Sequence, residues 1–377
     1  MINVIKKIKL NYLILKNILN LSNKKVKIIF YSESKFYQKF SYTLIEYFSK
    51  KYPHELYYVS SDLDDKIENL EINNLYIGNG LLMIFFFSII KAKFFFLTLT
   101  DLNNHSIKKN KNVDKYIYYN HAGSSTFSGY TEGSFDNYDV ILCNGQYQVD
   151  EIRFREKQKN LHKKDLILTG YFYFDHILKQ VSLKQTPNEI LVAPTWSYKY
   201  KKFINEKFIE IIDELIKKNY KVTFRPHPEH YKRSQNILKT IKEKFGSFDN
   251  FRFDNDHENI KSMGTAKCLI TDFSDISLEY SLLLSRPVLY LDFDKIHNEN
   301  YSNFKDFTSI ELKFKNEFGL IFSEKDIKKI DQLIDDSIKN FSLKIPRLNQ
   351  FKNEYYFNFG KTMKEFEKTW EDRILKS

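Results

Sequence analysis

The feature that most constrains the fold of this 377-residue chain is a regular alternation of short apolar runs with amphipathic helical patterns. Short apolar runs bounded by polar loops are typical of strands buried in a parallel sheet. Their alternation with helices predicts parallel sheets that carry helices on both faces. Strands are expected at residues 26–31, 56–59, 75–77, 94–99, 116–119, 140–143, 166–168, 190–193, 222–224, 268–270 and 288–291. Helices are expected at residues 36–50, 147–159, 203–218, 237–245 and 276–284.

A chain of this length is expected to form two domains, each able to bury its own core. The polar stretch Ser182 to Asn188 is the best candidate for the linker between them. We therefore expect an N-terminal Rossmann-like domain over residues 1–181 and a second one over residues 189–345. The segment 346–377 contains a long amphipathic pattern, Asn349 to Leu375, which is expected to form one helix that packs back across the first domain.

The most informative single stretch runs from Cys268 to Asp292. An apolar strand ends abruptly at Thr271-Asp272-Phe273-Ser274, and a helical pattern follows directly. Backbone N–H groups at the start of such a helix bind anions, phosphates above all. The alternative is an ordinary strand–helix–strand unit in which Ser274 merely caps the helix.

A second loop of the same type follows the strand that ends at Phe224. Its sequence is Arg225-Pro226-His227-Pro228-Glu229-His230. Arginine offers a planar fork to phosphate oxygens, and histidine offers a proton near neutral pH. Open α/β sheets bind their ligands at the carboxyl ends of the strands, so two such loops favour a functional site over two chance turns.

Further polar loops close strands elsewhere in the chain. His121, beside Gly123 and Ser124, follows the strand 116–119 and suits a general base that takes a proton from a hydroxyl. Asp101 closes the strand 94–99 and could hold a polar acceptor or cap a turn. Thr195 and Trp196 close the strand 190–193 and could contact a phosphate or a base, or simply pack.

The net charge of +11 is compatible with nucleic acid, an anionic membrane surface or phosphorylated substrates as partners, or with codon bias alone. The basic residues are spread over many helices and form no recognisable nucleic-acid module, so no nucleic-acid partner is expected. Phosphate-loop, dinucleotide-binding and nucleophile-elbow motifs are absent from the sequence. Cys143 and Cys268 lie in apolar runs and are expected to be reduced core residues, and no metal or cofactor is expected.

Two apolar segments bear on membrane association. Met1 to Leu21 is a basic amphipathic pattern that could lie on an anionic membrane or pack on the domain. Residues 80–100 are more apolar, but Lys91 and Lys93 interrupt them too soon for a bilayer span, so a helix, a turn and a buried strand are expected. With no convincing secretory signal, we expect a cytoplasmic protein that could bind peripherally to the inner face of the plasma membrane.

Taken in order, these loops resemble the CDP-glycerol glycerophosphotransferase family, of the teichoic-acid primase and polymerase type. The resemblance covers residues 75 to 300 and is more specific in its second half. The matching segments are His121-Ala122-Gly123, Gly170-Tyr171 through Asp175, Pro194-Thr195-Trp196, Arg225-Pro226-His227-Pro228, Thr271-Asp272-Phe273-Ser274 through Glu279, Arg286-Pro287 and, more loosely, Gly133 through Ile152.

The resemblance implies a GT-B fold and the transfer of glycerol phosphate, or a related polyol phosphate, from CDP-glycerol to a hydroxyl of a cell-surface glycan or its lipid-linked precursor. His121 would be the base, and His227 would stabilise the departing CMP. The donor-binding residues would be Arg225, Thr195, Ser274, Ser277, Glu279 and Asp272, with Glu279 on a ribose hydroxyl. Asp101 and Ser124 would lie on the acceptor side.

Two residues depart from the family pattern: Asp275 stands where a second serine is usual, and Ala122 where a glycine is common. A carboxylate beside a diphosphate is repulsive unless it turns away, caps the helix or binds a cation. The donor therefore remains open, and a GT-B glycosyltransferase or sugar-nucleotide epimerase is the alternative enzyme. A catalytically idle scaffold at the membrane surface is the alternative from another class.

Overall fold

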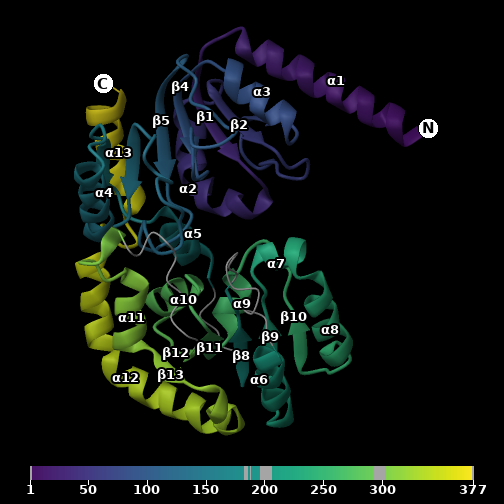
Figure 1. Cartoon of the computed structure of the whole chain (residues 1–377), viewed down its shortest axis with the longest axis vertical. Coiled ribbons are helices and arrows are strands. Elements are labelled where there is room, and N and C mark those ends of the chain that lie inside the picture. Colours follow the sequence, from purple (N-terminus) through teal and green to yellow (C-terminus); the bar gives the residue numbers. More distant parts are fainter. Residues whose placement is uncertain (1, 182–185, 187, 196–205, 293–302, 376–377) are drawn as a thin grey trace.

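The computed structural model describes residues 2–181, 186, 188–195, 206–292 and 303–375. Most of the expected linker, Trp196 and the start of the helix expected at 203–218 lie outside the described residues. The chain forms two α/β domains, each built on its own parallel sheet, and the two lie one above the other in Figure 1. The α/β class with parallel sheets, predicted from the alternation of strands and helices, is confirmed.

The first sheet has seven strands in the order β3-β2-β1-β4-β5-β6-β7. All neighbours in it are parallel. The order reverses direction between β1 and β4, which makes that pair the switch point where ligands of such sheets bind. The strands are β1 Val26–Ser32, β2 Leu56–Ser60, β3 Asn73–Tyr76, β4 Ala92–Leu97, β5 Val113–Tyr119, β6 Val140–Cys143 and β7 Asp165–Leu168. The helices of this half are α1 Ile2–Ser22, α2 Lys35–Lys51, α3 Leu81–Ile89, α4 Gln146–Gln158 and α5 Phe172–Gln180.

The second sheet has six strands in the order β10-β9-β8-β11-β12-β13, again all parallel. The strands are β8 Glu189–Val192, β9 Lys221–Phe224, β10 Phe251–Phe253, β11 Cys268–Thr271, β12 Val288–Leu291 and β13 Leu320–Phe322. The helices are α6 Glu206–Lys217, α7 Pro228–Arg233, α8 Gln235–Phe245, α9 Ile260–Thr265, α10 Ile276–Leu284, α11 Ile310–Phe318, the 3₁₀ turn η2 Glu324–Lys329, α12 Ile330–Tyr355, α13 Thr362–Thr369 and the π-helical turn η3 Trp370–Leu375.

Each expected strand is present, with ends shifted by at most a few residues, and two edge strands were not expected. These are β10 and β13, which have three residues each and leave part of their side chains exposed. The single helix expected from Asn349 to Leu375 is wrong. The helical pattern instead begins at Ile330 in the second domain and runs to Tyr355 through Pro346, and a break separates it from α13. The boundary expected between residues 345 and 346 therefore falls inside α12.

The end of the chain crosses from the second domain back to the first. After α12 the Phe357 N–H donates to the Asn144 carbonyl at 2.8 Å, directly beyond β6. This crossing needs glycine at position 145, because a Cβ there would lie 1.7 Å from the Tyr355 carbonyl oxygen. Trp370 then enters the core of the first domain, where it is fully buried and its ring centroid lies 4.7 Å from that of Phe48.

Helix α1 packs on the first domain along part of its length, and its binding to a membrane stays a prediction. Its C-terminal part packs on the first domain through Ile14, Ile18 and Leu21, which are buried. Residues 6–13 are exposed, and Figure 1 shows the start of the helix projecting away from the domain. Among the described residues, no helix is both long enough and apolar enough to cross a bilayer.

Candidate functional site

Polar loops from the two domains meet at one interface, which we call the interdomain site. The Ser124 hydroxyl, after β5, donates to Asp275 Oδ2 at 3.2 Å, at the start of α10. The Tyr171 hydroxyl, after β7, donates to Glu279 Oε1 at 3.1 Å on the same helix. Because these loops follow strands of parallel sheets, both sheets direct their carboxyl ends towards this interface, as expected for a ligand site.

His121 lies on the first-domain side of the interdomain site, among aromatic rings. The centroids of Tyr37 and Tyr130 lie 5.5 and 5.8 Å from that of its imidazole, and the Tyr118 hydroxyl lies 3.3 Å from Nδ1. Burial lowers the pKa of His121 to about 4, and a hydrogen bond with the Thr98 backbone opposes this only in part. The ring is therefore neutral at pH 7 and has one unprotonated nitrogen, as a general base requires.

His227 lies on the opposite side, in the loop between β9 and α7. It caps α7, since its Nδ1 accepts the Glu229 N–H at 3.2 Å, and the proton of the neutral ring is then on Nε2. The side chain of His227 stays open to solvent in part, and desolvation, followed by the charge of His230, lowers its pKa. The charges of Lys39 and His121 contribute to the same shift, so both residues are near the ring although they belong to the other domain.

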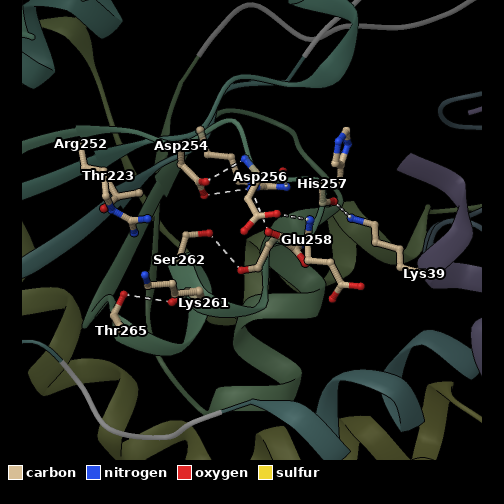
Figure 2. Close-up of polar contacts among 12 residues, drawn as sticks. Lys39, Thr223, Arg252, Asp254, Asp256, His257, Glu258, Lys261, Ser262 and Thr265 are labelled. Atoms are coloured by element: carbon tan, nitrogen blue, oxygen red, sulfur yellow. Dashed lines mark hydrogen bonds and ion pairs between the residues drawn. The ribbon is translucent and has the colours of Figure 1, made fainter. Parts of the chain in front are cut away.

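Arg225 does not present a free fork to the interdomain site. Its Nη1 donates to Asp254 Oδ2 at 2.9 Å and to the Glu258 carbonyl at 3.2 Å, and its Nη2 donates to the Asp256 carbonyl at 2.9 Å. Figure 2 shows the loop 254–258 that these contacts hold. The expectation that Arg225 binds the diphosphate stays a prediction. In this geometry the guanidinium instead stabilises the loop 254–258.

Thr195 and Asp272 join two neighbouring loops of the second domain. The Thr195 N–H donates to Asp272 Oδ1 at 2.9 Å, and the Phe273 N–H donates to the same oxygen at 2.7 Å. Asp272 is 2% exposed and burial raises its pKa to about 6, while its Oδ2 has no partner among the described residues. His230 completes this arrangement, because its Nε2 lies 2.9 Å from the Thr195 carbonyl.

The predicted donor-binding residues in α10 and in the turn before it lie in different environments. Ser274 is partly exposed in the turn before the helix, where its carbonyl accepts the Ser277 N–H at 3.0 Å. Ser277 is 3% exposed and lies beside Tyr290 of β12, within the domain. Glu279 is buried at the interface between Tyr171 and Asn259, and burial raises its pKa. The structure thus places Glu279 at the interdomain site and Ser277 in the domain interior, while Ser274 lies in the turn directly before Asp275.

The departure at position 275 has a structural explanation. The Asp275 side chain does not cap α10 but turns to the first domain, where it accepts the Ser124 hydroxyl. It faces Glu311 of α11, and burial together with the Asp275 charge raises the pKa of Glu311 to about 8. Glu311 Oε1 accepts from the Ser125 N–H at 3.3 Å and from the Ser128 hydroxyl, while its Oε2 has no partner among the described residues.

Asp101, predicted on the acceptor side, fastens a turn of the first domain. It has a left-handed backbone, with φ of 63°, and its Oδ1 accepts from the hydroxyls of Thr131 at 2.7 Å and Ser134 at 3.1 Å. These contacts shape the loop that follows His121. Its role towards an acceptor stays a prediction.

Two charged residues of the interdomain site, Glu33 and Lys39, were not identified as site residues from the sequence. Glu33 follows β1, and burial raises its pKa to about 7, with Lys232 and Glu229 of the second domain acting on it in opposite directions. Its position after a predicted strand could have identified it. Lys39 lies one helical turn into α2, and nothing distinguishes it by sequence from the other 58 of the 59 lysines and arginines. Among the described residues, no group of His, Cys, Asp and Glu side chains is arranged to hold a metal ion.

A family model described as CDP-Glycerol:Poly(glycerophosphate) glycerophosphotransferase matches residues 15–323, which is most of the chain. The chain belongs to this family. The resemblance seen in the loop motifs is thereby confirmed, and the match includes both histidine loops.

Individual relatives of this chain are distant. The minor teichoic acid biosynthesis protein GgaB of Bacillus subtilis (strain 168) is 23% identical over 165 residues, which is 37% of this chain but only 17% of GgaB. The wall teichoic acid polymerase TagF has a similar structure, with a TM-score of 0.62 and 16% identity over 94% of this chain and 89% of that one. The structure of a putative UDP-N-acetylglucosamine 2-epimerase from Listeria monocytogenes is also similar. Its TM-score is 0.57 and its sequence identity is 11%, over 93% of this chain and 97% of that one. These likenesses confirm the GT-B fold with two Rossmann-like domains.

Proposed function

We propose that this glycerophosphotransferase moves glycerol phosphate, or a related polyol phosphate, from a CDP-linked donor to a hydroxyl of a teichoic-acid-like or capsular surface glycan or its lipid-linked precursor. The observation that carries the proposal is the pair of histidines, His121 and His227, which come from opposite domains, are neutral at pH 7 and lie near enough that protonation of one would disfavour protonation of the other. Family membership and the titles of TagF and GgaB support the same substrate class.

In the proposed reaction the acceptor hydroxyl gives its proton to the unprotonated nitrogen of His121. Its oxygen forms a bond to the phosphorus of the glycerol phosphate group, and the bond from that phosphorus to the oxygen of CMP breaks. CMP leaves with the electron pair of the broken bond, and the Nε2–H of His227 donates to a phosphate oxygen. Ser274 and the N–H groups at the start of α10 take other phosphate oxygens. Positioning and charge stabilisation of this kind are the main requirements of phosphoryl transfer.

The test is CMP release from CDP-glycerol in the presence of a glycerol-phosphate-primed acceptor. His121→Ala and His227→Ala should each reduce release by about a hundredfold or more, because each removes a proton-transfer or charge-stabilising group. Lys50→Met, on the exposed end of α2, is the matched control and should leave release unchanged. Undiminished release in either histidine variant would contradict the assigned roles.

A second candidate is a GT-B glycosyltransferase or sugar-nucleotide epimerase, which the structural likeness to the Listeria epimerase favours. Thermal shift measurements with CDP-glycerol, CDP-ribitol, UDP-N-acetylglucosamine and GDP-mannose separate the two. Stabilisation by the UDP-sugar alone would favour the epimerase or glycosyltransferase. Stabilisation by none of these compounds would favour a scaffold without catalytic activity.

We also propose that α1 attaches the protein to an anionic membrane, where a lipid-linked acceptor would be. The side chains of Ile8, Tyr12 and Leu13 are 63%, 66% and 53% exposed, and Lys9 and Lys16 on the same helix are exposed as well. Exposed apolar residues beside lysines suit the headgroup region of an anionic bilayer. Ile8→Glu with Leu13→Glu should abolish co-sedimentation with phosphatidylglycerol vesicles, and retained binding of this variant would refute the proposal.

A further inference from the structure

The interdomain site needs a cation for the donor diphosphate, and the residue expected to supply it is otherwise engaged. Both terminal nitrogens of Arg225 donate to the loop 254–258, and the Arg225–Asp254 ion pair is almost fully buried. A guanidinium held in this way cannot turn to a phosphate without breaking a buried ion pair, which is costly. The geometry therefore directs the search to other cations near His227.

Lys39 is such a cation, and it comes from the first domain. It extends from α2 across the interface to the loop 254–258, where its Nζ lies 3.5 Å from the His257 carbonyl oxygen (Figure 2). Phe36, one turn earlier on α2, packs its ring at 4.6 Å from that of His257. The Lys39 ammonium also lies 5.2 Å from the centre of the Tyr173 ring. These contacts hold its aliphatic stem and leave the ammonium near Arg225 and near His227, and its charge helps to lower the pKa of His227.

The ammonium has more hydrogen-bonding capacity than its surroundings use. It carries three donors, yet among the described residues it has a single acceptor, at the limit of hydrogen-bonding distance, and no carboxylate within 4.0 Å. Burial and the charge of Arg225 lower its pKa to about 8. The charged and titratable groups that face it are Arg225, His227, Asp256, Glu258 and Glu279 of the second domain. A partly buried ammonium with unused donors is a suitable binding group for an anion.

We propose that Lys39 binds the diphosphate of the nucleotide donor from the first domain, in the place expected for Arg225. This inference rests on the proposed nucleotide-dependent function and specifies how the donor is held. Lys39 would then join the two domains through the donor itself, because the same phosphate oxygens would be held by α10 on one side and by α2 on the other.

Calorimetric titration of the full chain with CDP, CMP and cytidine tests the proposal. Lys39→Met keeps the aliphatic stem and removes the charge, and it should weaken CDP binding by about ten- to a hundredfold while cytidine binding stays the same. Lys39→Arg should retain CDP binding. Lys50→Met removes the same charge from an exposed position at the end of the same helix and should change nothing. Unchanged cytidine binding by the Met variant also shows that it is folded.

A pH series gives an independent readout. The CDP affinity of the wild type should fall as the pH rises above about 8, because Lys39 loses its proton there. The Lys39→Arg variant should show no such fall, since arginine stays charged. A structural role for Lys39 alone would not produce this difference between the two proteins.

The outcomes for Lys39 and for the proposed function can be distinguished. If the wild type binds CDP and Lys39→Met binds it equally well, the inference about Lys39 is overturned and the proposed function stands. If the wild type binds UDP and not CDP, the proposed donor is wrong, and the same variants titrated with UDP decide the role of Lys39. If the wild type binds no nucleotide, both are overturned.

Discussion

Glu311→Gln is the substitution whose effect on stability follows most directly from the structure. Glu311 is 7% exposed and faces Asp275, and one of its oxygens has no partner among the described residues. Glutamine has the same shape and can still accept from the Ser125 N–H and the Ser128 hydroxyl through Oε1. The substitution therefore removes a buried ionisable group and leaves the contacts between the domains in place.

The magnitude follows from the pKa of Glu311, which burial and the Asp275 charge raise from 4.5 to about 8. Between these two values the unfolded chain ionises while the folded protein keeps the proton. The folded state then binds more protons than the unfolded state, so the free energy of unfolding falls as the pH rises, by about 1.4 kcal/mol per pH unit. Because the shift is shared with Asp275, the fall caused by Glu311 should total about 2 to 5 kcal/mol between pH 5 and pH 8.5.

Urea unfolding at pH 5, 7 and 8.5, followed by circular dichroism, measures this effect. We expect wild type and Glu311→Gln to agree within about 1 kcal/mol at pH 5 and the variant to be more stable by about 2 to 5 kcal/mol at pH 8.5. Ser128→Ala is a useful second variant, because the Ser128 hydroxyl lowers the pKa of Glu311, and its loss should extend the decline in stability to higher pH with the same slope. Parallel curves for wild type and Glu311→Gln would refute the reasoning.

Three further results are expected. His121→Asn should keep its affinity for CDP and lose about a hundredfold or more in the rate of CMP release. In the wild type, kcat/KM should not fall between pH 7 and 5.5, because the pKa of His121 is about 4. A loss of kcat/KM with a midpoint near pH 6.5 would contradict this assignment. Asp254→Ala should lower the free energy of unfolding by about 3 to 5 kcal/mol, since it leaves the Arg225 charge buried without its ion-pair partner, and a change below 1 kcal/mol in urea unfolding would contradict it. Gly145→Ala should destabilise by more than about 3 kcal/mol or prevent folding, because its Cβ would overlap the Tyr355 carbonyl; a thermal melting temperature equal to that of the wild type would exclude the close approach.

The sequence predicted the architecture well because the signals were local. Strands such as β6 and β12 are short apolar runs between polar loops, and their bounds agree with the prediction. The edge strands β10 and β13 have only three residues each, which are too few to show the period of a strand. The start of α12 was predicted wrongly, because a proline and polar residues normally indicate a helix boundary. Pro346 instead lies inside α12, which begins sixteen residues earlier, at Ile330.

The interdomain site was predictable only in part, for a physical reason. His121 and His227 follow strands, so their place at the carboxyl edge of a sheet is fixed by the local sequence. The partners of Arg225 come from a loop about thirty residues later, and no sequence pattern predicts its ion pair with Asp254. Asp275 is paired with Ser124 of the other domain, and such a contact depends on how the domains meet.

The return of the chain's end to the first domain has a consequence for how the protein is made. Residues 26–168 contribute all seven strands of the first sheet, yet Trp370 fills part of its core against Phe48 and Phe94. During synthesis the first domain therefore cannot complete its core until Trp370 has left the ribosome, long after the strands of that domain have emerged. Loss of the segment that carries Trp370 would accordingly damage the first domain, although that segment lies far from it in the sequence.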